Sequence, residues 1–427
     1  MRKTFKLGAI VTYGGGAIKT LTEAAGELRE EGIQVQVRAA TPSSDLDWEE
    51  FFRWLAEEAD AFFLLGGNPE EYGGLLKTLL ARQKVVVTKE PGRSTVPPEH
   101  VAKLERYYKY GGKENLKNFI LYLGKLAGFD FHPGEPEEVP WQGIYHPKLG
   151  VFEEPGRYKR EYEKRLGLRP EVGLLFYRSY WLDGNLALVD ALVGELEGRG
   201  IGVIPVFGQG TEDKKLGSPG NREALKLLEG VEVVVNLQSF SLVPRNPAQE
   251  ESPLSPLNVP VLQGLKEYYR TEEEWREDPK GISPLSQVMC VAQPEFDGTI
   301  EPLLLAARKD VRLEGASAYG SYQVYAPIPD RIRYLADRIE GWLRLKQVPR
   351  EKRRVTFVLH NSPCKGLEAT VGRGAGLDTL ESVVRIMRQL REAGYRVEGV
   401  PEDGKALIDM IICLLYTSDA ADDGESV

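Results

Sequence analysis

One pattern, a helix-ending glycine followed directly by a new strand, occurs three times in this sequence. Leu-x-x-x-Gly-[Ile/Tyr]-x-Val spans residues 28–35, 196–203 and 390–397. In each copy the glycine suits the position after a helix, where a positive φ is needed, and β-branched or aromatic residues open the next strand. Apolar strands precede the three helices at residues 7–13, 172–177 and 355–360. The pattern therefore predicts α/β units with parallel sheets, produced either by internal duplication or by convergence on one local architecture.

The spacing of these units predicts several domains, as does the length of 427 residues. We expect an N-terminal α/β domain over residues 1–131, a Pro- and Gly-rich linker over 132–170, a second α/β domain over 171–350 and the start of a third α/β unit over 351–410. Residues 411–427 change character abruptly, and LLYTSDAADD within them resembles a translated sequencing adapter. This tail is predicted to be non-native, the alternative being a genuine acidic disordered tail.

Composition argues against several classes of function. The net charge of -9 does not favour nucleic acid or an anionic membrane as partner. No apolar run is long enough to predict a membrane span. Three widely spaced cysteines predict neither a disulfide framework nor a zinc site, which fits a cytoplasmic protein. The phosphate-binding pattern G-x-x-x-x-G-K-[ST] is absent, so we expect no P-loop ATPase site on this chain.

Two segments carry polar and aromatic residues at predicted strand ends or in loops. WQGIYHP places Tyr145 and His146 in a predicted loop, where functional residues concentrate, although a loop histidine can also serve only structural hydrogen bonds. FYRSYWLDGN follows a predicted strand, and ligands of open α/β sheets bind at the carboxyl ends of strands. Its aromatic rings and guanidinium suit a flat ring that carries carboxylates. Asp183 or Asn185 is alternatively the N-cap of the next helix. The polar and aromatic residues of this segment are Arg178, Ser179, Tyr180, Trp181, Asp183 and Asn185.

A carboxylate-rich segment, QPEFDGTIEP, contains Glu295, Asp297 and Glu301. Hard divalent ions favour oxygen ligands, and proton abstraction needs a base of tuned pKa. Carboxylates placed close together raise one another's pKa, which favours a base that works near neutral pH. The alternative is a turn without function, since Asp-Gly is a common turn dipeptide.

The last segment of interest, HNSPCKGLEATVGRGAGLDTLESV, begins with His360 at a predicted strand end. One histidine and one cysteine, Cys364, do not predict a closed zinc site without further ligands at suitable spacing. The glycine-rich VGRGAGLD precedes a helix whose N-cap is predicted to be Asp378 or Thr379, and backbone amides at such a helix start suit an anion.

Taken together and in order, the segments YGGKENLKN, GIYHP, LLFYRSYWLDGN, PEFDGTIEP and HNSPCKGLEATVGRGAGLDTLESV resemble the large subunit of cobaltochelatase (CobN type) and the related magnesium chelatase H subunit. The resemblance covers nearly the whole chain up to about residue 410. GIYHP, FYRSYW and HNSPCKG are more similar to the cobalt branch, whereas PEFDG has Phe296 where the family usually has Leu. Family members are far longer, so the resemblance implies a C-terminally truncated piece of a multidomain class II chelatase subunit with several Rossmann-like units.

The resemblance also implies a reaction and its participants. The family subunit binds the tetrapyrrole, and here we expect Co²⁺ insertion into hydrogenobyrinic acid a,c-diamide for cobalamin biosynthesis. AAA+ ATPase and integrin-domain partner subunits would hold ATP and Mg²⁺, and the fragment alone is expected to be inactive. The alternatives are a magnesium chelatase H subunit acting on protoporphyrin IX and a non-catalytic corrinoid or tetrapyrrole carrier. The expected catalytic residues are Glu295, Asp297, Glu301 and His360; the expected metal ligands are His146 and Glu295; the expected substrate-binding residues are Arg178, Tyr180, Trp181, Asn185 and Tyr145.

Overall fold

The computed structural model describes residues 3–11, 16–42, 44–67, 70–89, 92–242, 251–312, 321–360, 372, 374 and 376–422. The chain divides into two compact units, residues 1–339 and 340–427, which are described separately. Within the described residues, no helix combines the length and apolar character that crossing a bilayer requires.

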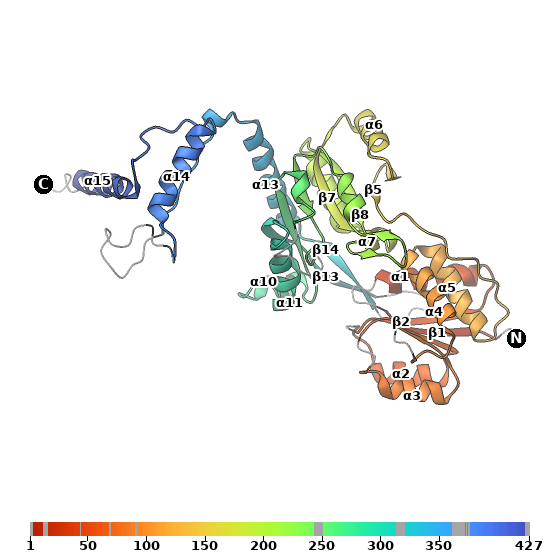
Figure 1. Cartoon of the computed structure of the whole chain (residues 1–427). Helices are drawn as coiled ribbons and strands as arrows, with labels where there is room; N and C mark the ends of the chain where they lie inside the picture. The colour runs from red at the N-terminus through yellow and green to blue at the C-terminus, as the bar shows by residue number, and fades with distance from the viewer. Residues whose placement is uncertain are drawn as a thin grey trace. The chain divides into compact units, whose positions relative to one another are not determined.

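The first unit begins with a parallel sheet, four-stranded within the described residues, in the order β2-β1-β3-β4 (Figure 1). One face of the sheet packs against α1, α4 and α5, and the other against α2 and α3, so apolar side chains are buried on both faces. This arrangement confirms the predicted α/β architecture. The elements are β1 (Phe5–Ile10), α1 (Gly16–Glu30), β2 (Val35–Ala40), α2 (Trp48–Glu57), β3 (Ala61–Leu64), α3 (Gly73–Ala81), β4 (Val85–Thr88), α4 (Pro98–Tyr110) and α5 (Lys113–Leu126).

A second sheet in the same unit has eight strands among the described residues, in the order β14-β13-β12-β11-β7-β8-β5-β6. Strands β13, β12, β11, β7 and β8 are parallel, and antiparallel strands complete both edges. The strands are β5 (Gly143–His146), β6 (Gly150–Phe152), β7 (Pro170–Tyr177), β8 (Gly202–Gly208), β11 (Val233–Asn236), β12 (Val261–Glu267), β13 (Ile300–Arg312) and β14 (Ser321–Pro327).

The loop predicted for the GIYHP segment is wrong, because its residues form β5 in this sheet. Gly143 and Ile144 pair with Phe207 and Val206 of β8, and the Ile144 side chain is buried between them and the helices that cover the sheet. His146 is consequently a strand residue with its ring inside the protein.

Helices connect these strands, and glycines end two of them as predicted. Gly32 and Gly200 have φ of 85° and 78°, in the left-handed region that suits glycine after a helix. The predicted N-cap role of Asp183 or Asn185 is wrong, since Leu186 precedes α8 and Asp183 instead ends α7. The helices of this part are α6 (Pro155–Leu166), α7 (Arg178–Leu182), α8 (Ala187–Gly198), α9 (Arg222–Lys226), α10 (Glu272–Glu277), α11 (Pro284–Gln287), a π-helical turn (Val288–Ala292), α12 (Gln293–Glu295) and α13 (Pro329–Gln347).

The second unit contains α14 (Thr379–Glu392) and α15 (Gly404–Asp422) after the end of α13. Asp378 caps α14 by accepting a hydrogen bond from the Glu381 amide at 3.1 Å, which confirms the predicted N-cap. The strand predicted at 355–360 is not formed, because this segment pairs with no other strand among the described residues, and an unpaired segment lacks the ladder hydrogen bonds of a sheet. Helix α15 runs through residue 411 without a break, while the non-native origin of residues 411–427 stays a prediction.

Candidate ligand-binding site

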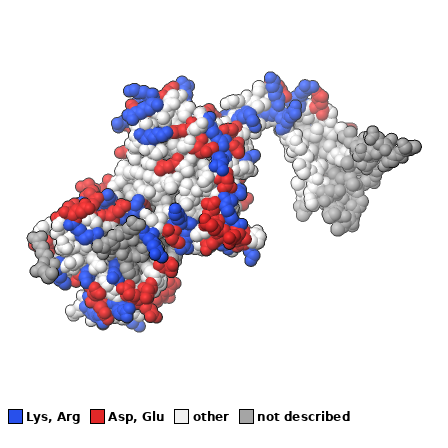
Figure 2. Space-filling model, turned by 180° about the vertical axis from the view of Figure 1, so that it is seen from behind, with Lys and Arg blue, Asp and Glu red and all other residues white. Residues whose placement is uncertain are grey.

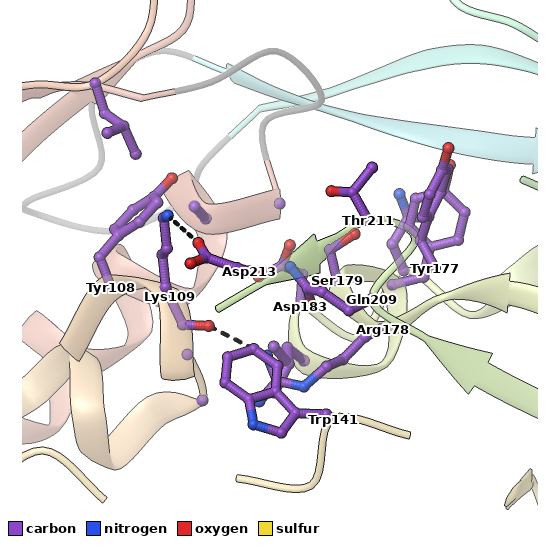
Figure 3. A pocket seen from close by; sticks show the side chains of 18 of the residues that line it. Tyr108, Lys109, Trp141, Tyr177, Arg178, Ser179, Asp183, Gln209, Thr211 and Asp213 are labelled. Carbon is purple, nitrogen blue, oxygen red and sulfur yellow. Dashed lines mark hydrogen bonds and ion pairs between the residues drawn. The ribbon is translucent and has the colours of Figure 1, made fainter. Parts of the chain in front are cut away.

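A cavity of about 540 Å³ lies in the first unit, where the carboxyl ends of strands from both sheets face one another (Figure 3). Leu65 and Lys89 follow β3 and β4, Tyr177 ends β7, and Gln209 follows β8. This volume falls in the range of small-molecule sites. The carboxyl edge of a parallel sheet is also where open α/β folds bind ligands, so this cavity is the candidate site.

Aromatic rings form much of the cavity wall. The ring centres of Tyr177 and Tyr180 lie 5.8 Å apart, those of Tyr180 and Tyr325 5.9 Å, and those of Tyr268 and Tyr325 5.2 Å. Burial raises the pKa of all four hydroxyls, so they stay protonated at neutral pH. A neutral aromatic surface of this kind suits a flat conjugated ligand.

Lys266 lies behind this aromatic wall with 1% of its surface exposed. Its ammonium donates to the Leu237 carbonyl and lies 5.4 Å from the ring centre of Tyr180 and 5.9 Å from that of Tyr268. No carboxylate pairs with it in the part of the chain that the structure describes. Burial lowers the pKa of Lys266 to about 8, and the tyrosine faces supply cation–π attraction in place of a counter-ion.

Arg178 is buried beneath the cavity with 1% exposure and cross-links two backbone segments. Its guanidinium donates to the carbonyls of Lys109 (3.2 Å), Tyr110 (2.7 Å), Val139 (2.9 Å) and Pro140 (2.7 Å). These bonds use four of the five guanidinium N–H groups. Burial lowers the pKa of Arg178 to about 10. Arg178 thus holds the cavity wall together in this structure, whereas the sequence pattern predicts a pairing with a substrate carboxylate.

Several polar side chains of the cavity make no hydrogen bond or ion pair to any described residue and are available to a ligand. Three of the predicted substrate-binding residues, Arg178, Tyr180 and Asn185, line this cavity together. Asn185 lies there with three other neutral polar side chains and with the ammonium of Lys89, which follows β4 of the first sheet. The uncommitted side chains are Lys89, Ser179, Asn185, Gln209 and Thr211.

Asp183 joins the two sides of the cavity. Its carboxylate accepts a hydrogen bond from Thr20 Oγ1 at 3.2 Å, and its carbonyl accepts one from Lys19 at 3.4 Å. Burial raises the pKa of Asp183 to about 7. Helix α1 begins with Gly16 at this contact, because a Cβ at Gly16 would lie 2.3 Å from an oxygen of Asp183. The carboxylate therefore requires a glycine opposite it.

The other two predicted substrate residues lie outside the cavity. Trp181 stacks on Phe207 with ring centres 4.4 Å apart, and the Tyr145 hydroxyl donates to Asp190 at 3.0 Å. Both residues therefore pack within the second sheet and its helices.

His146 is fully buried, and both of its ring nitrogens have partners. Nε2 lies 2.7 Å from Glu197 Oε1, and Nδ1 accepts from the Lys148 amide at 3.1 Å. A nitrogen that accepts an N–H is unprotonated, so the proton is on Nε2 and is donated to Glu197. No ring nitrogen is left for a metal in this arrangement. The contacts of His146 are those of a histidine that serves structural hydrogen bonds.

The three carboxylates of PEFDGTIE do not converge. Asp297 is buried and accepts from Ser241 Oγ (2.9 Å) and the Leu242 amide (2.7 Å), Glu301 forms a two-pronged ion pair with Arg338, and Glu295 is exposed. None of the three lines the cavity. Ile300, which lies between Asp297 and Glu301, pairs with Leu262 near the amino end of β12, whereas the cavity residue Tyr268 follows its carboxyl end, about 20 Å further along the strand.

No group of three or more His, Cys, Asp or Glu side chains in the described chain is placed to hold a metal. His360 belongs to the second unit and is exposed. Cys364 and the rest of residues 361–371 lie outside the described residues.

Comparison with known proteins agrees with the motifs. The family described as CobN/Magnesium Chelatase matches residues 105–422. The chain belongs to this family. It is 30% identical over 405 residues to the uncharacterized protein MJ1441 of Methanocaldococcus jannaschii, covering 92% of this chain and 31% of that protein. The chain thus spans about a third of the length of this relative.

Relatives from both metal branches are about equally similar. The magnesium-chelatase H subunit of Rhodobacter capsulatus is 29% identical over 72% of this chain and 26% of its own length. The aerobic cobaltochelatase CobN subunit of Sinorhizobium is 28% identical over 75% of this chain and 25% of its own length. The catalytic subunit of cobaltochelatase from Mycobacterium tuberculosis has the same fold, with a TM-score of 0.55 at 24% identity over 96% of this chain and 33% of that one.

Sequence reasoning missed several residues in the cavity wall and behind it. Lys266 is hidden in the segment VPVLQGLKE, which reads as a buried strand, although a lysine in an apolar strand is itself an unusual feature. Tyr268 and Tyr325 carry no motif, and the ion pair of Lys109 with Asp213 joins residues far apart in sequence. Lys109 and Asp213 meet because two sheets face each other, whereas Lys266, Tyr268 and Tyr325 come together through the strand order of the second sheet.

Proposed function

We propose that the chain is part of the tetrapyrrole-binding large subunit of an ATP-dependent cobaltochelatase, which inserts Co²⁺ into hydrogenobyrinic acid a,c-diamide during cobalamin biosynthesis in the cytoplasm. Membership of the chelatase family supports metal insertion. The observation that carries the proposal is the aromatic-walled cavity of about 540 Å³ at the carboxyl edges of both sheets. The preference for cobalt rests on the GIYHP, FYRSYW and HNSPCKG segments.

In this proposal the ring lies against the tyrosines of the cavity, and its side groups meet uncommitted polar residues. Tyr180 offers an aromatic face, and Asn185 and Gln209 offer amide donors and acceptors. Lys89, an exposed ammonium at the end of β4, would pair with a ring carboxylate. Arg178 would act indirectly, by holding the wall on which the ring rests.

Metal insertion requires that ring nitrogens lose protons while Co²⁺, the substrate metal, sheds water. Among the residues predicted for this chemistry, we propose Glu295, whose carboxylate is exposed, as proton acceptor and transient metal ligand. Glu295 does not line the cavity, so this role requires that the ATP-driven conformational cycle of the partner subunits bring the ring to it. His360 is proposed separately as a nitrogen ligand or proton shuttle. Asp297 would position the Glu295 segment through its bonds to Ser241 and Leu242, and Glu301 through its ion pair with Arg338.

ATP and its Mg²⁺ would bind AAA+ and integrin-domain partner subunits, in keeping with the missing P-loop pattern.

Acidic and basic side chains both occur on the face drawn in Figure 2, and the net charge is -9, so a nucleic-acid partner is not proposed.

The test is metal insertion by the full-length protein with its ATPase partners, followed by absorbance. Two substrate pairs are offered: Co²⁺ with hydrogenobyrinic acid a,c-diamide, and Mg²⁺ with protoporphyrin IX. We expect insertion of cobalt only. Magnesium insertion would favour the magnesium chelatase alternative, and ring binding without insertion of either metal would favour a carrier.

One substitution tests the role of Glu295. Glu295→Ala should abolish insertion and leave ring binding intact, whereas Glu277→Ala, which removes another exposed carboxylate at the end of α10, should leave both unchanged. Normal turnover in the Glu295→Ala protein would refute the assignment.

A further inference from the structure

A short hairpin separates the candidate cavity from a second cavity. It is formed by β9 (Glu212–Asp213) and β10 (Ser218–Pro219). Thr211 and Glu212 line both the cavity of about 540 Å³ and a neighbouring one of about 720 Å³. The hairpin is therefore a wall shared by two spaces, and its position sets the size of each.

The hairpin is built to turn about a fixed base. Its ladder consists of two residue pairs, all within the fully described range 92–242. Gly210 and Gly220 at its two ends have φ of 87° and 64°, a region that glycine enters without steric cost. The Gly210 amide donates to Asn221 Oδ1 at 3.2 Å, and Asn221 exchanges two hydrogen bonds with the buried Gln238. The base is thus anchored while glycines flank the hairpin.

One ion pair ties the hairpin to α4, which packs against the first sheet. Lys109 at the end of α4 lies 2.8 Å from Asp213, and the two side chains are 32% and 31% exposed (Figure 3). The Lys109 carbonyl is held by Arg178, and its ammonium has a second partner, Glu105, at 3.3 Å. Release of Asp213 would therefore leave Lys109 fixed and still paired, so the hairpin is the part that is able to move.

We propose that Lys109 and Asp213 are positioning residues that latch this hairpin as a movable cavity wall, and that releasing the latch joins the two cavities to admit a macrocycle with bulky side groups. The latch rests on the proposed function for the class of ligand. A partly exposed ion pair contributes little stability, so the latch opens at low cost and closes again over a bound ring. The residues between the hinge glycines then discriminate among rings by the size of their side groups.

The experiment has a readout that needs no ligand. In the full-length protein, amide hydrogen exchange of residues 210–220 is compared between the wild type, Lys109→Met, Asp213→Asn and the double variant. We expect about two- to fivefold faster exchange in each single variant. The double variant should be no faster than either single one, because both substitutions remove the same contact. The matched control is Lys113→Met, which removes an ion pair with Glu27 of similar length, 2.7 Å, and should leave residues 210–220 unchanged.

Ring binding is the second readout. Stopped-flow mixing with hydrogenobyrinic acid a,c-diamide should show association and dissociation rates raised together, about two- to fivefold, in the two single variants. High salt should move the wild type toward the variants, since salt screens the pair. Unchanged exchange of the hairpin, or additive effects in the double variant, would overturn the latch. Faster hairpin exchange in a protein that binds no ring would support the latch and refute the proposed function.

Discussion

Replacing Arg178 by methionine tests whether this residue holds the cavity wall or binds a substrate. The guanidinium donates to four backbone carbonyls, at residues 109, 110, 139 and 140, and lies 4.5 Å from the ring centre of Trp141. Methionine fills much of the same space but donates no hydrogen bond. In Arg178→Met the four carbonyls lose their donor, while the cost of burying a charge disappears.

The size of the effect follows from these two opposing terms. A buried acceptor left without a donor costs about 1–3 kcal/mol, and four acceptors are affected. Methionine also removes the cost of burying a charge, a cost that is visible in the pKa of Arg178, which burial lowers to about 10. This gain offsets several kcal/mol of the loss. We expect the free energy of unfolding to fall by about 3–5 kcal/mol, which is what remains of about 4–12 kcal/mol for four acceptors after this offset. Arg178→Lys should lose less, because an ammonium reaches one or two of the carbonyls but lacks the planar fork.

The assay is urea unfolding of the chain, combined with amide exchange of residues 107–112 and 137–142. Both segments should lose protection in Arg178→Met. Arg276→Met is the matched control, because Arg276 is an exposed arginine paired with Glu272 and Asp330 and should cost less than about 1 kcal/mol. If Arg178→Met kept the stability and protection of the wild type but bound the ring more weakly, the clamp would be refuted and the substrate-carboxylate role supported.

Two buried ionisable groups make stability depend on pH in opposite ranges. Burial raises the pKa of Asp183 to about 7, so its contribution is complete below about pH 4 and is lost as pH rises through 7. Asp183→Asn should flatten urea stability between these values and gain about 1–3 kcal/mol at pH 8; an unchanged slope would contradict this. Burial lowers the pKa of Lys266 to about 8, so its contribution is present above about pH 10.4 and lost as pH falls through 8. Lys266→Met should gain about 1–2 kcal/mol at pH 7; a loss of stability there would show that the bond to the Leu237 carbonyl outweighs the burial.

The sequence predicted those parts of the fold that depend on residues close together along the chain. The glycines at 32 and 200 end helices because their neighbours form helices and only glycine readily takes the left-handed conformation that follows. β5 was missed because Gly143 and Ile144 become a strand through pairing with Phe207 and Val206, more than sixty residues away. Conversely, VTFVLH has strand composition at residues 355–360 but no partner strand among the described residues, and a strand exists only with a partner.

The same distinction holds in the candidate site: features set by neighbouring residues were predicted, and contacts between distant residues were not. Tyr180 and Asn185 line the cavity, and the sequence pointed to them because a general rule places ligands at strand ends and β7 ends just before them. For Arg178 the residue type was informative, but the sequence gives the charge of a guanidinium and not which oxygen lies nearest. Its carbonyl partners belong to residues up to 69 positions away, and its pairing with a substrate carboxylate stays a prediction. The carboxylates of PEFDGTIE do not converge in this structure for the converse reason, and their catalytic role stays a prediction. Asp297 sits in a turn facing Ser241, whereas Glu301 begins a strand facing Arg338 on α13. Residues close in sequence therefore share a site only where the backbone does not turn between them. Residues far apart in sequence meet where the two sheets face each other, and their spacing in the sequence does not predict this contact.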